Sequence, residues 1–181
     1  RADIFNNPFV AKIMYFLRIL PMVRQRDGLR NVLKNKDTQE VIVETLENGV
    51  RFCMFPEGKH RTKHSLQVLG KGVFRAALAA NEKFGSERPI YIVPIGIEYG
   101  DYFRYRSTSL VNYGNAINVT EFVKTHDVEN DVQIIEPLRK ELTSRMSELM
   151  TFISDDENYE AKWALLKMLS IAGSKKGYGD F

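Results

Sequence analysis

The residues of this chain best suited to chemistry lie in one short segment. Phe55-Pro56-Glu57-Gly58 ends an apolar run, and the basic segment Lys59-His60-Arg61 follows it directly. A carboxylate can accept a hydrogen bond from a hydroxyl group, a glycine lets a ligand approach the backbone, and adjacent cations can hold a phosphate. The segment is therefore a candidate site for a ligand with hydroxyl and phosphate groups. The alternative is a tight turn with solvated charges.

The elements around this segment place it at the end of a strand. Residues 50–55 are apolar and β-favouring, and Pro56 ends the run. In open α/β sheets, ligands bind just outside the carboxyl ends of the strands. Residues 71–84 have the apolar spacing of a buried helix.

Strands and helices alternate along the rest of the chain. This alternation predicts an α/β fold with a mostly parallel sheet flanked by helices. At 181 residues the chain suits one domain, with residues 132–172 as a helical C-terminal extension. Helices are expected from Pro8 to Pro21, from Asp37 to Gly49 and over 71–84, 132–153 and 157–171. Strands are expected over 50–55, 90–99, 109–113 and 117–119. Pro94 would interrupt the second of these strands, and a turn at Gly114-Asn115 would separate the last two.

Composition excludes several classes of protein. The single cysteine, Cys53, cannot form an intrachain disulfide, and the sequence has no Cys/His cluster with metal-ligand spacing. The net charge of +3 (26 − 23) hides an asymmetry, because residues 1–75 hold 14 basic and 7 acidic residues while residues 76–181 hold 12 and 16. The first half is thus suited to an anionic partner: a phosphate, a nucleic-acid backbone or an anionic bilayer surface.

The N-terminal region is apolar without being a membrane span. Residues 9–23 are interrupted by Lys12 and Arg18, and they are shorter than the ~20 apolar residues that a span requires. The chain begins at Arg1 and shows no secretory signal. We therefore expect part of a longer chain, with the N-terminal part of the domain absent.

Four features together resemble the glycerolipid acyltransferase superfamily, typified by 1-acylglycerol-3-phosphate and glycerol-3-phosphate acyltransferases. Its Phe-Pro-Glu-Gly motif is met in full at Phe55 to Gly58. Pro21-Met22-Val23-Arg24 is similar to a second family feature, a Pro and an Arg just after an apolar helix. The helix start at Leu69 to Ala77 and the apolar block Ile92-Val93-Pro94-Ile95 resemble two later family features, in the family's order.

The resemblance implies transfer of a fatty acyl group from a coenzyme A or acyl-carrier-protein thioester to a hydroxyl of glycerol phosphate or a lysophospholipid, with no bound cofactor. It implies that Arg24 contacts the acceptor phosphate, a role that suits a bidentate guanidinium. Within the substrate-binding turn Phe55-Pro56-Glu57-Gly58, Glu57 and Gly58 would position the glycerol portion. Supporting phosphate contacts would come from Lys59, His60, Arg61 and Lys71.

The sequence departs from the family pattern in two ways. After Phe-Pro-Glu-Gly the family usually continues Thr-Arg-Ser, whereas Lys59-His60-Arg61 stands here, with a histidine at the usual arginine position. The catalytic dyad, His-x-x-x-x-Asp, precedes the arginine block in the family, and residues 1–20 contain no histidine. The dyad is therefore expected upstream of Arg1, and this chain alone is expected to be inactive.

A second match to the dyad spacing is interpreted as a coincidence. His126 and Asp131 stand five positions apart, but they follow Glu57 by about seventy residues instead of preceding it. Asp131 is better explained as the N-cap of the following helix, and His126 as an exposed loop residue.

Two other kinds of protein remain as alternatives. One is a non-catalytic module that docks on anionic membranes through the basic residues of the first half and the apolar helix that begins at Pro8. Membrane contact also suits the acyltransferase, because the resemblance implies a cytoplasmic protein associated peripherally with the membrane. The other is a nucleic-acid binder that stacks bases on the aromatic and basic run 99–113. The acidic second half argues against it, so no nucleic acid is expected as a partner.

Overall fold

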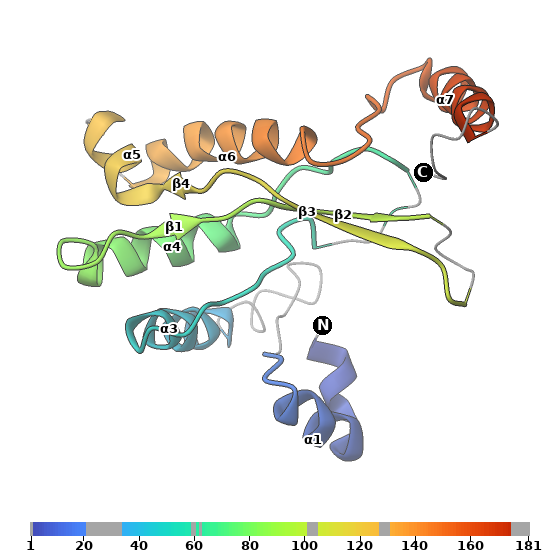
Figure 1. Ribbon diagram of the computed structural model, residues 1–181. Helices are drawn as coiled ribbons and strands as arrows, with labels where there is room; N and C mark the ends of the chain where they lie inside the picture. Colours follow the sequence, from blue (N-terminus) through green and yellow to red (C-terminus); the bar gives the residue numbers. More distant parts are fainter. Residues whose placement is uncertain are drawn as a thin grey trace.

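The computed structural model describes residues 2–20, 34–58, 61, 63–100, 105–126 and 131–174. Helices and strands both occur, so the expectation of a mixed α/β fold is confirmed (Figure 1). The elements are η1 (Ala2–Asn6), α1 (Pro8–Phe16), α3 (Lys34–Glu47), α4 (Gly72–Phe84), β1 (Tyr91–Ile92), β2 (Ile95–Tyr99), β3 (Ser109–Tyr113), β4 (Ile117–Asn118), α5 (Val119–His126), α6 (Asp131–Ser147) and α7 (Tyr159–Ser174).

The described strands form two antiparallel pairs that follow one another along the same two chain segments, 91–99 and 109–118, which we call the ribbon. β1 pairs with β4 and β2 pairs with β3, both antiparallel. The mostly parallel sheet expected from the alternation of elements is therefore not what the described strands form. Connectivity explains the difference, because residues 100–108 join β2 to β3 and are too few for the crossover that a parallel pair requires.

A bulge separates the two paired stretches of the ribbon. Residues 114–116 lie between β3 and β4, whereas only residues 93–94 lie between β1 and β2, so one strand carries an extra residue. The expected interruption at Pro94 is confirmed. The expected turn at Gly114-Asn115 is wrong, because β3 and β4 run in the same direction along the ribbon. Arg145 of α6 donates to the carbonyl oxygens of Asn115 and Ala116, each over 3.0 Å.

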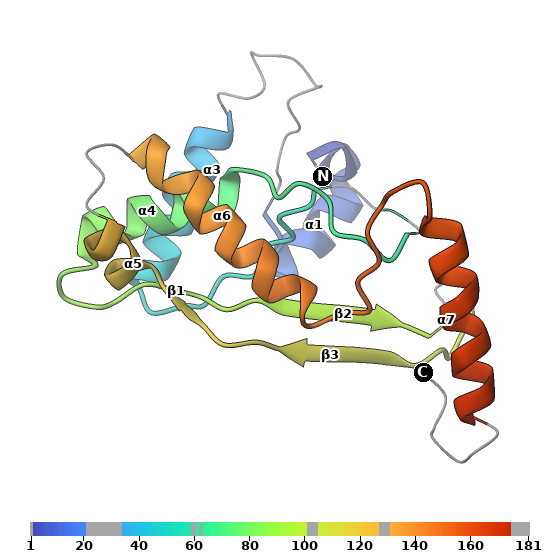
Figure 2. The same ribbon diagram turned by 90° about the horizontal axis from the view of Figure 1, so that it is seen from above.

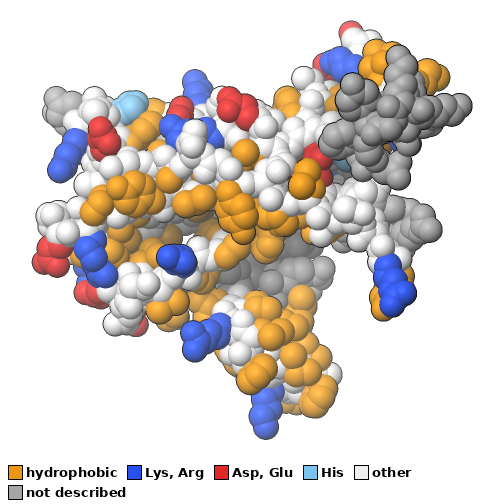
Figure 3. All heavy atoms as spheres, viewed as in Figure 1, with side chains coloured by type: hydrophobic (Ala, Val, Ile, Leu, Met, Phe, Trp, Pro, Cys, Tyr) orange, Lys and Arg blue, Asp and Glu red, His pale blue; other side chains and the backbone are white. Residues whose placement is uncertain are grey.

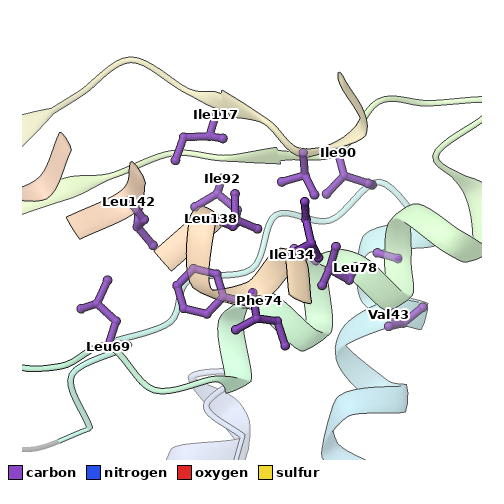
Figure 4. Close-up of a cluster of buried hydrophobic side chains, with 14 of the residues drawn as sticks. Val43, Leu69, Phe74, Leu78, Ile90, Ile92, Ile117, Ile134, Leu138 and Leu142 are labelled. Atoms are coloured by element: carbon purple, nitrogen blue, oxygen red, sulfur yellow. The ribbon is translucent and has the colours of Figure 1, made fainter. Parts of the chain in front are cut away.

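Helices α3, α4 and α6 lie on one side of the ribbon, and α4 packs against both other helices (Figures 1 and 2). The core forms where α4, α6 and the strands meet. Figure 4 shows the side chains that meet there, and the fully enclosed ones include Phe74, Leu138 and Ile117. Burying such apolar side chains is the main favourable term in folding. The opposite face of the ribbon is exposed, at Ile97, Tyr99, Val111 and Tyr113.

Helix α1 forms a projecting unit with η1. Its start is as predicted, because the Asn7 Oδ1 accepts from the backbone N–H groups of Phe9 (3.0 Å) and Val10 (3.4 Å). It ends at Phe16, earlier than the expected stop before Pro21, because Arg18 takes the left-handed conformation with φ 57°. None of its residues is buried, and Figure 3 shows hydrophobic side chains gathered on this unit.

The remaining helices differ from expectation mainly at their ends. Gly49, with φ 75°, ends α3 as predicted, but α3 begins at Lys34, before the expected start at Asp37. Helix α5 was not predicted. Helix α6 stops at Ser147, before the expected end at 153, and α7 begins at Tyr159; residues 148–158, in turns and irregular backbone, join these two expected helices.

Candidate functional site

The turn Phe55-Pro56-Glu57-Gly58 forms as its residue types require. The backbone N–H of Gly58 donates to the carbonyl oxygen of Phe55 over 3.3 Å, which closes a four-residue turn with Pro56 at its second position. Gly58 has φ 63°, the left-handed region that glycine adopts without strain. Among the described residues, no atom outside its immediate neighbours would lie within 4 Å of a Cβ on Gly58, so none of them covers the backbone there.

The segment before the turn is extended but is not a strand. Residues 50–55 pair with no strand of the described chain, and Phe55 is 74% exposed. The prediction of a buried strand is therefore wrong. Alternate residues explain why the sequence resembled one: Phe52 and Met54 are half-buried, whereas Arg51, Cys53 and Phe55 are exposed. Successive side chains of an extended backbone point to opposite sides, so a segment covered on one side alternates between covered and exposed residues as a strand does. A strand also needs a hydrogen-bonded neighbour.

Two hydrogen bonds fasten the turn to the segment that precedes α4. Glu57 Oε2 accepts from the backbone N–H of Gln67 over 3.2 Å, and the carbonyl oxygen of Pro56 accepts from the backbone N–H of Gly70 over 2.7 Å. Leu69 lies between these contacts and is 1% exposed in the core. The core therefore fixes the position of the turn through Leu69.

The same contacts bring Lys71 and the start of α4 to the turn. Lys71 follows Gly70 directly and is exposed. It precedes α4 without a side-chain hydrogen bond to the helix, and the first turn of α4 holds no acidic residue. Unpaired backbone N–H groups at a helix N-terminus favour an anion. The segment just before Lys71 thus lies against the turn that contains Glu57 and Gly58, and the binding role of these three residues stays a prediction.

Arg61 is placed differently, in an ion-paired cluster with the C-terminal region. Its Nη1 lies 2.9 Å from Asp155 Oδ2, and Lys63 Nζ lies 2.5 Å from Asp155 Oδ1. The hydrogen bond from Lys63, with that from Arg61, holds the pKa of Asp155 below its ordinary value. Arg61 therefore has a carboxylate partner, which its prediction as a phosphate ligand did not foresee.

The segment that carries Asp155 is attached to the same basic loop by further contacts, among them Lys63 Nζ over the Tyr159 ring at 4.8 Å from its centroid. The backbone N–H of Ile153 donates to the carbonyl oxygen of His64 over 2.7 Å, and the backbone N–H of His64 donates to the hydroxyl of Tyr159 over 2.8 Å. The His64 ring stacks on Trp163 with centroids 4.3 Å apart. Sequence analysis missed this group, because no local pattern links residues about ninety positions apart.

Three predicted site residues, Arg24, Lys59 and His60, lie outside the described residues. Within the described ranges, no group of three His, Cys, Asp or Glu side chains could hold a metal ion. A shallow cleft of about 410 Å³ between α3 and α4 is lined by Glu40, Glu44 and Lys83 among others, and it contains none of the predicted site residues.

His126 is not arranged as a catalytic base. It ends α5, is exposed, and stacks on Phe122 with centroids 4.0 Å apart. Its Nδ1 lies 2.9 Å from the Phe122 carbonyl oxygen, so the ring contacts the end of its own helix. The prediction of exposure is confirmed, although the residue belongs to a helix and not to a loop.

The described residues define a mixed α/β domain in which a glycine turn, a lysine and a helix start lie together. The family model described as Acyltransferase matches residues 1–98, just over half of the chain and all of the predicted substrate-binding residues. The chain therefore belongs to the Acyltransferase family, which confirms the resemblance found in the sequence. No curated protein and no solved structure matches the chain.

Proposed function

We propose that this chain binds the phosphorylated acceptor of an acyl transfer at the turn Phe55-Pro56-Glu57-Gly58. The observation that carries the proposal is the pair of hydrogen bonds by which Gln67 and Gly70, just before Lys71 and α4, hold the turn that contains the left-handed Gly58. Family membership supplies the reaction class. The proposed acceptor is glycerol phosphate or a lysophospholipid, and the proposed donor is an acyl-coenzyme A or acyl-carrier-protein thioester.

The proposed reaction forms an ester and releases a thiol. The acceptor oxygen attacks the thioester carbonyl carbon, a base takes the hydroxyl proton, the carbon–sulfur bond breaks, and the thiolate leaves with a proton. We place the base in a His-x-x-x-x-Asp dyad upstream of Arg1. Glu57 is assigned a positioning role, because one of its oxygens accepts the Gln67 N–H and holds the turn.

The binding role is tested on this 181-residue chain with sn-glycerol 3-phosphate. Glu57→Ala removes the hydrogen bond to Gln67, and Lys71→Ala removes a cation from the turn. Each is expected to weaken binding about threefold to tenfold, measured by calorimetry, the range for losing one hydrogen bond. Lys140→Ala removes an exposed lysine from α6 and serves as the control. Equal affinity for all four proteins contradicts the proposed site.

The catalytic role is tested on a protein that includes the residues preceding Arg1. Arg24→Lys is expected to raise the acceptor KM roughly tenfold or more, because a bidentate phosphate contact is lost. Alanine at the upstream histidine is expected to abolish acyl transfer, whereas His126→Ala is expected to leave it unchanged. Robust transfer by the 181-residue chain, lost in His126→Ala, contradicts the assignment of the dyad.

A second proposed property is docking of α1 on an anionic membrane surface, which suits a peripheral cytoplasmic acyltransferase. Within the described ranges, no helix is both long and apolar enough to cross a bilayer. Helix α1 instead exposes Phe9 (72%), Phe16 (85%) and Lys12, and Arg18, two residues after its end, is also exposed. Apolar and basic side chains on one exposed helix suit the interface between lipid headgroups and acyl chains.

Vesicle sedimentation tests this docking. The chain is expected to sediment at low salt with phosphatidylcholine vesicles that contain phosphatidylglycerol, and less with phosphatidylcholine alone. Phe16→Ser is expected to weaken binding about tenfold, since a fully buried Phe side chain contributes about 1.5–3 kcal/mol. Val68→Ser is the control, because Val68 is 82% exposed outside α1. Equal sedimentation of the two variants contradicts docking through α1.

A further inference from the structure

Asp155 forms ion pairs with two cationic side chains in the loop that follows the candidate turn. Each of its carboxylate oxygens has a separate cationic partner, Arg61 for Oδ2 and Lys63 for Oδ1. Arg61 and Lys63 thus converge on one small anion with two oxygen atoms. A phosphate group presents the same kind of acceptor with a larger charge, so the geometry that holds Asp155 also suits a phosphate.

Asp155 belongs to a segment attached mainly to this loop. Ile153 and Tyr159 are each 4% exposed, and they hold the segment through the backbone of His64. Beyond Trp163, helix α7 is largely uncovered: Leu165 is 59% exposed and Leu169 is 62% exposed. Figure 2 shows α7 at one end of the molecule, apart from the layer formed by α3, α4 and α6. Among the described residues, the loop supplies the ion pairs, hydrogen bonds and ring stacking that hold this segment, and the Thr151 N–H, which donates to Glu98 of β2, anchors its start.

The ion pairs themselves are weak enough to exchange. The side chains of Arg61 and Lys63 are 44% and 41% exposed, and that of Asp155 is 31% exposed. Ion pairs in contact with water contribute little to stability and are screened by salt. A doubly charged phosphate monoester at the same cations therefore competes effectively with a singly charged carboxylate.

We propose that Arg61 and Lys63 form a phosphate-binding pair and that Asp155 is an internal anion which the phosphate of the ligand displaces. This inference rests on the proposed function for the class of ligand, a phosphate monoester, and adds the residue that competes with it. Asp155 lies beyond residues 1–98, the part matched by the family model. The C-terminal segment would thus lower the affinity of the site for its ligand, because the phosphate must compete with Asp155 for Arg61 and Lys63.

The experiment compares Asp155→Asn with Asp156→Asn in the 181-residue chain. Asp156 is a matched control, because its Oδ2 pairs with Lys162 over 2.5 Å within its own segment and its loss changes the net charge equally. Calorimetry with sn-glycerol 3-phosphate is expected to show binding about threefold to fivefold tighter for Asp155→Asn than for the wild type, the ratio for losing a competing exposed ion pair. Asp156→Asn is expected to bind as the wild type does.

Trp163 gives a second readout. It is the single tryptophan of the chain, and it stacks on His64 beside the cation pair. Titration of the wild type with sn-glycerol 3-phosphate is expected to change the Trp163 emission in parallel with binding, whereas sodium chloride at equal ionic strength is not. In Asp155→Asn/Arg61→Gln the gain in affinity is expected to disappear, because the pair that receives the phosphate is incomplete.

Equal or weaker binding by Asp155→Asn, with circular dichroism showing that the variant is folded, contradicts the displacement of Asp155. The same conclusion follows if none of the proteins binds the probe. The acyl-transfer assay with Arg24→Lys decides the proposed function separately, because Arg24 belongs to neither the loop nor the C-terminal segment. The two proposals can therefore fail independently.

Discussion

The backbone N–H of Gly70 donates a hydrogen bond to the carbonyl oxygen of Pro56 over 2.7 Å, so the residue before Lys71 fastens the candidate turn to the start of α4. A Cβ on Gly70 would lie 3.1 Å from that same oxygen. The contact therefore leaves almost no room for a side chain. Because Leu69, next to Gly70, is buried in the core, the segment cannot easily retreat from the turn.

Gly70→Ala is expected to destabilise the chain by about 1 kcal/mol, the low end of the cost of inserting a methyl group into a packed contact. It is also expected to weaken binding of sn-glycerol 3-phosphate, because the turn must shift relative to Lys71. Urea denaturation measures the first effect and calorimetry the second. An unchanged affinity in a destabilised Gly70→Ala protein would show that the Pro56–Gly70 contact does not position the site.

Gly96→Ala is expected to destabilise the chain more strongly, by about 1–3 kcal/mol. A Cβ on Gly96 would lie 2.8 Å from the Leu149 Cβ and against the Leu149 backbone carbonyl, which joins β2 to the end of α6. Gly100→Ala is the control, since its Cβ would lie 3.5 Å from the nearest atom, the Ser107 Oγ. Comparable midpoints for the two variants in urea denaturation would contradict close packing of β2 on α6.

Arg145→Leu is expected to cost about 1.5–3 kcal/mol, the range for hydrogen bonds to a charged group. The Arg145 Nη1 donates to the carbonyl oxygens of Asn115 and Ala116 in the bulge, and leucine cannot replace these bonds. The measurement is the free energy of unfolding in urea. Lys140→Leu, at an exposed position of the same helix, is expected to change it little. A similar loss in both variants would assign the effect to helix α6 and not to the bulge.

Acid is expected to release the C-terminal segment from the basic loop. The hydrogen bond from Lys63, followed by that from Arg61, keeps the pKa of folded Asp155 below its ordinary value of 3.8. The contribution of this carboxylate is therefore fully present above about pH 4 and is lost as pH falls through the lowered pKa. Trp163 emission followed from pH 5 to pH 2 is expected to show a component that Asp155→Asn lacks and Asp156→Asn keeps.

If wild type and Asp155→Asn give the same acid profile, the ion pairs do not hold the segment. Asp156 also has a lowered pKa, because of Lys162, so its variant controls for titration elsewhere in the segment.

The sequence by itself determined the features that depend on neighbouring residues. Asn7 caps α1, Gly49 ends α3, Pro94 interrupts the ribbon, and Phe55 to Gly58 form a turn. Each of these follows from the backbone preferences or hydrogen-bonding groups of a few adjacent residues. The family could be identified for the same reason, since its motifs are short and occur in order in residues 1–98.

Tertiary structure decided the features that join distant residues. Residues 50–55 have the alternation of a strand, but whether extended backbone becomes a strand depends on a partner elsewhere in the chain. The antiparallel ribbon, the support of the bulge by Arg145 and the pairing of Arg61 with Asp155, 94 positions away, likewise depend on packing. Side-chain ion pairs carry no sequence signal at such separations, because any exposed acid can satisfy any exposed base. Only the folded chain brings this acid to these bases.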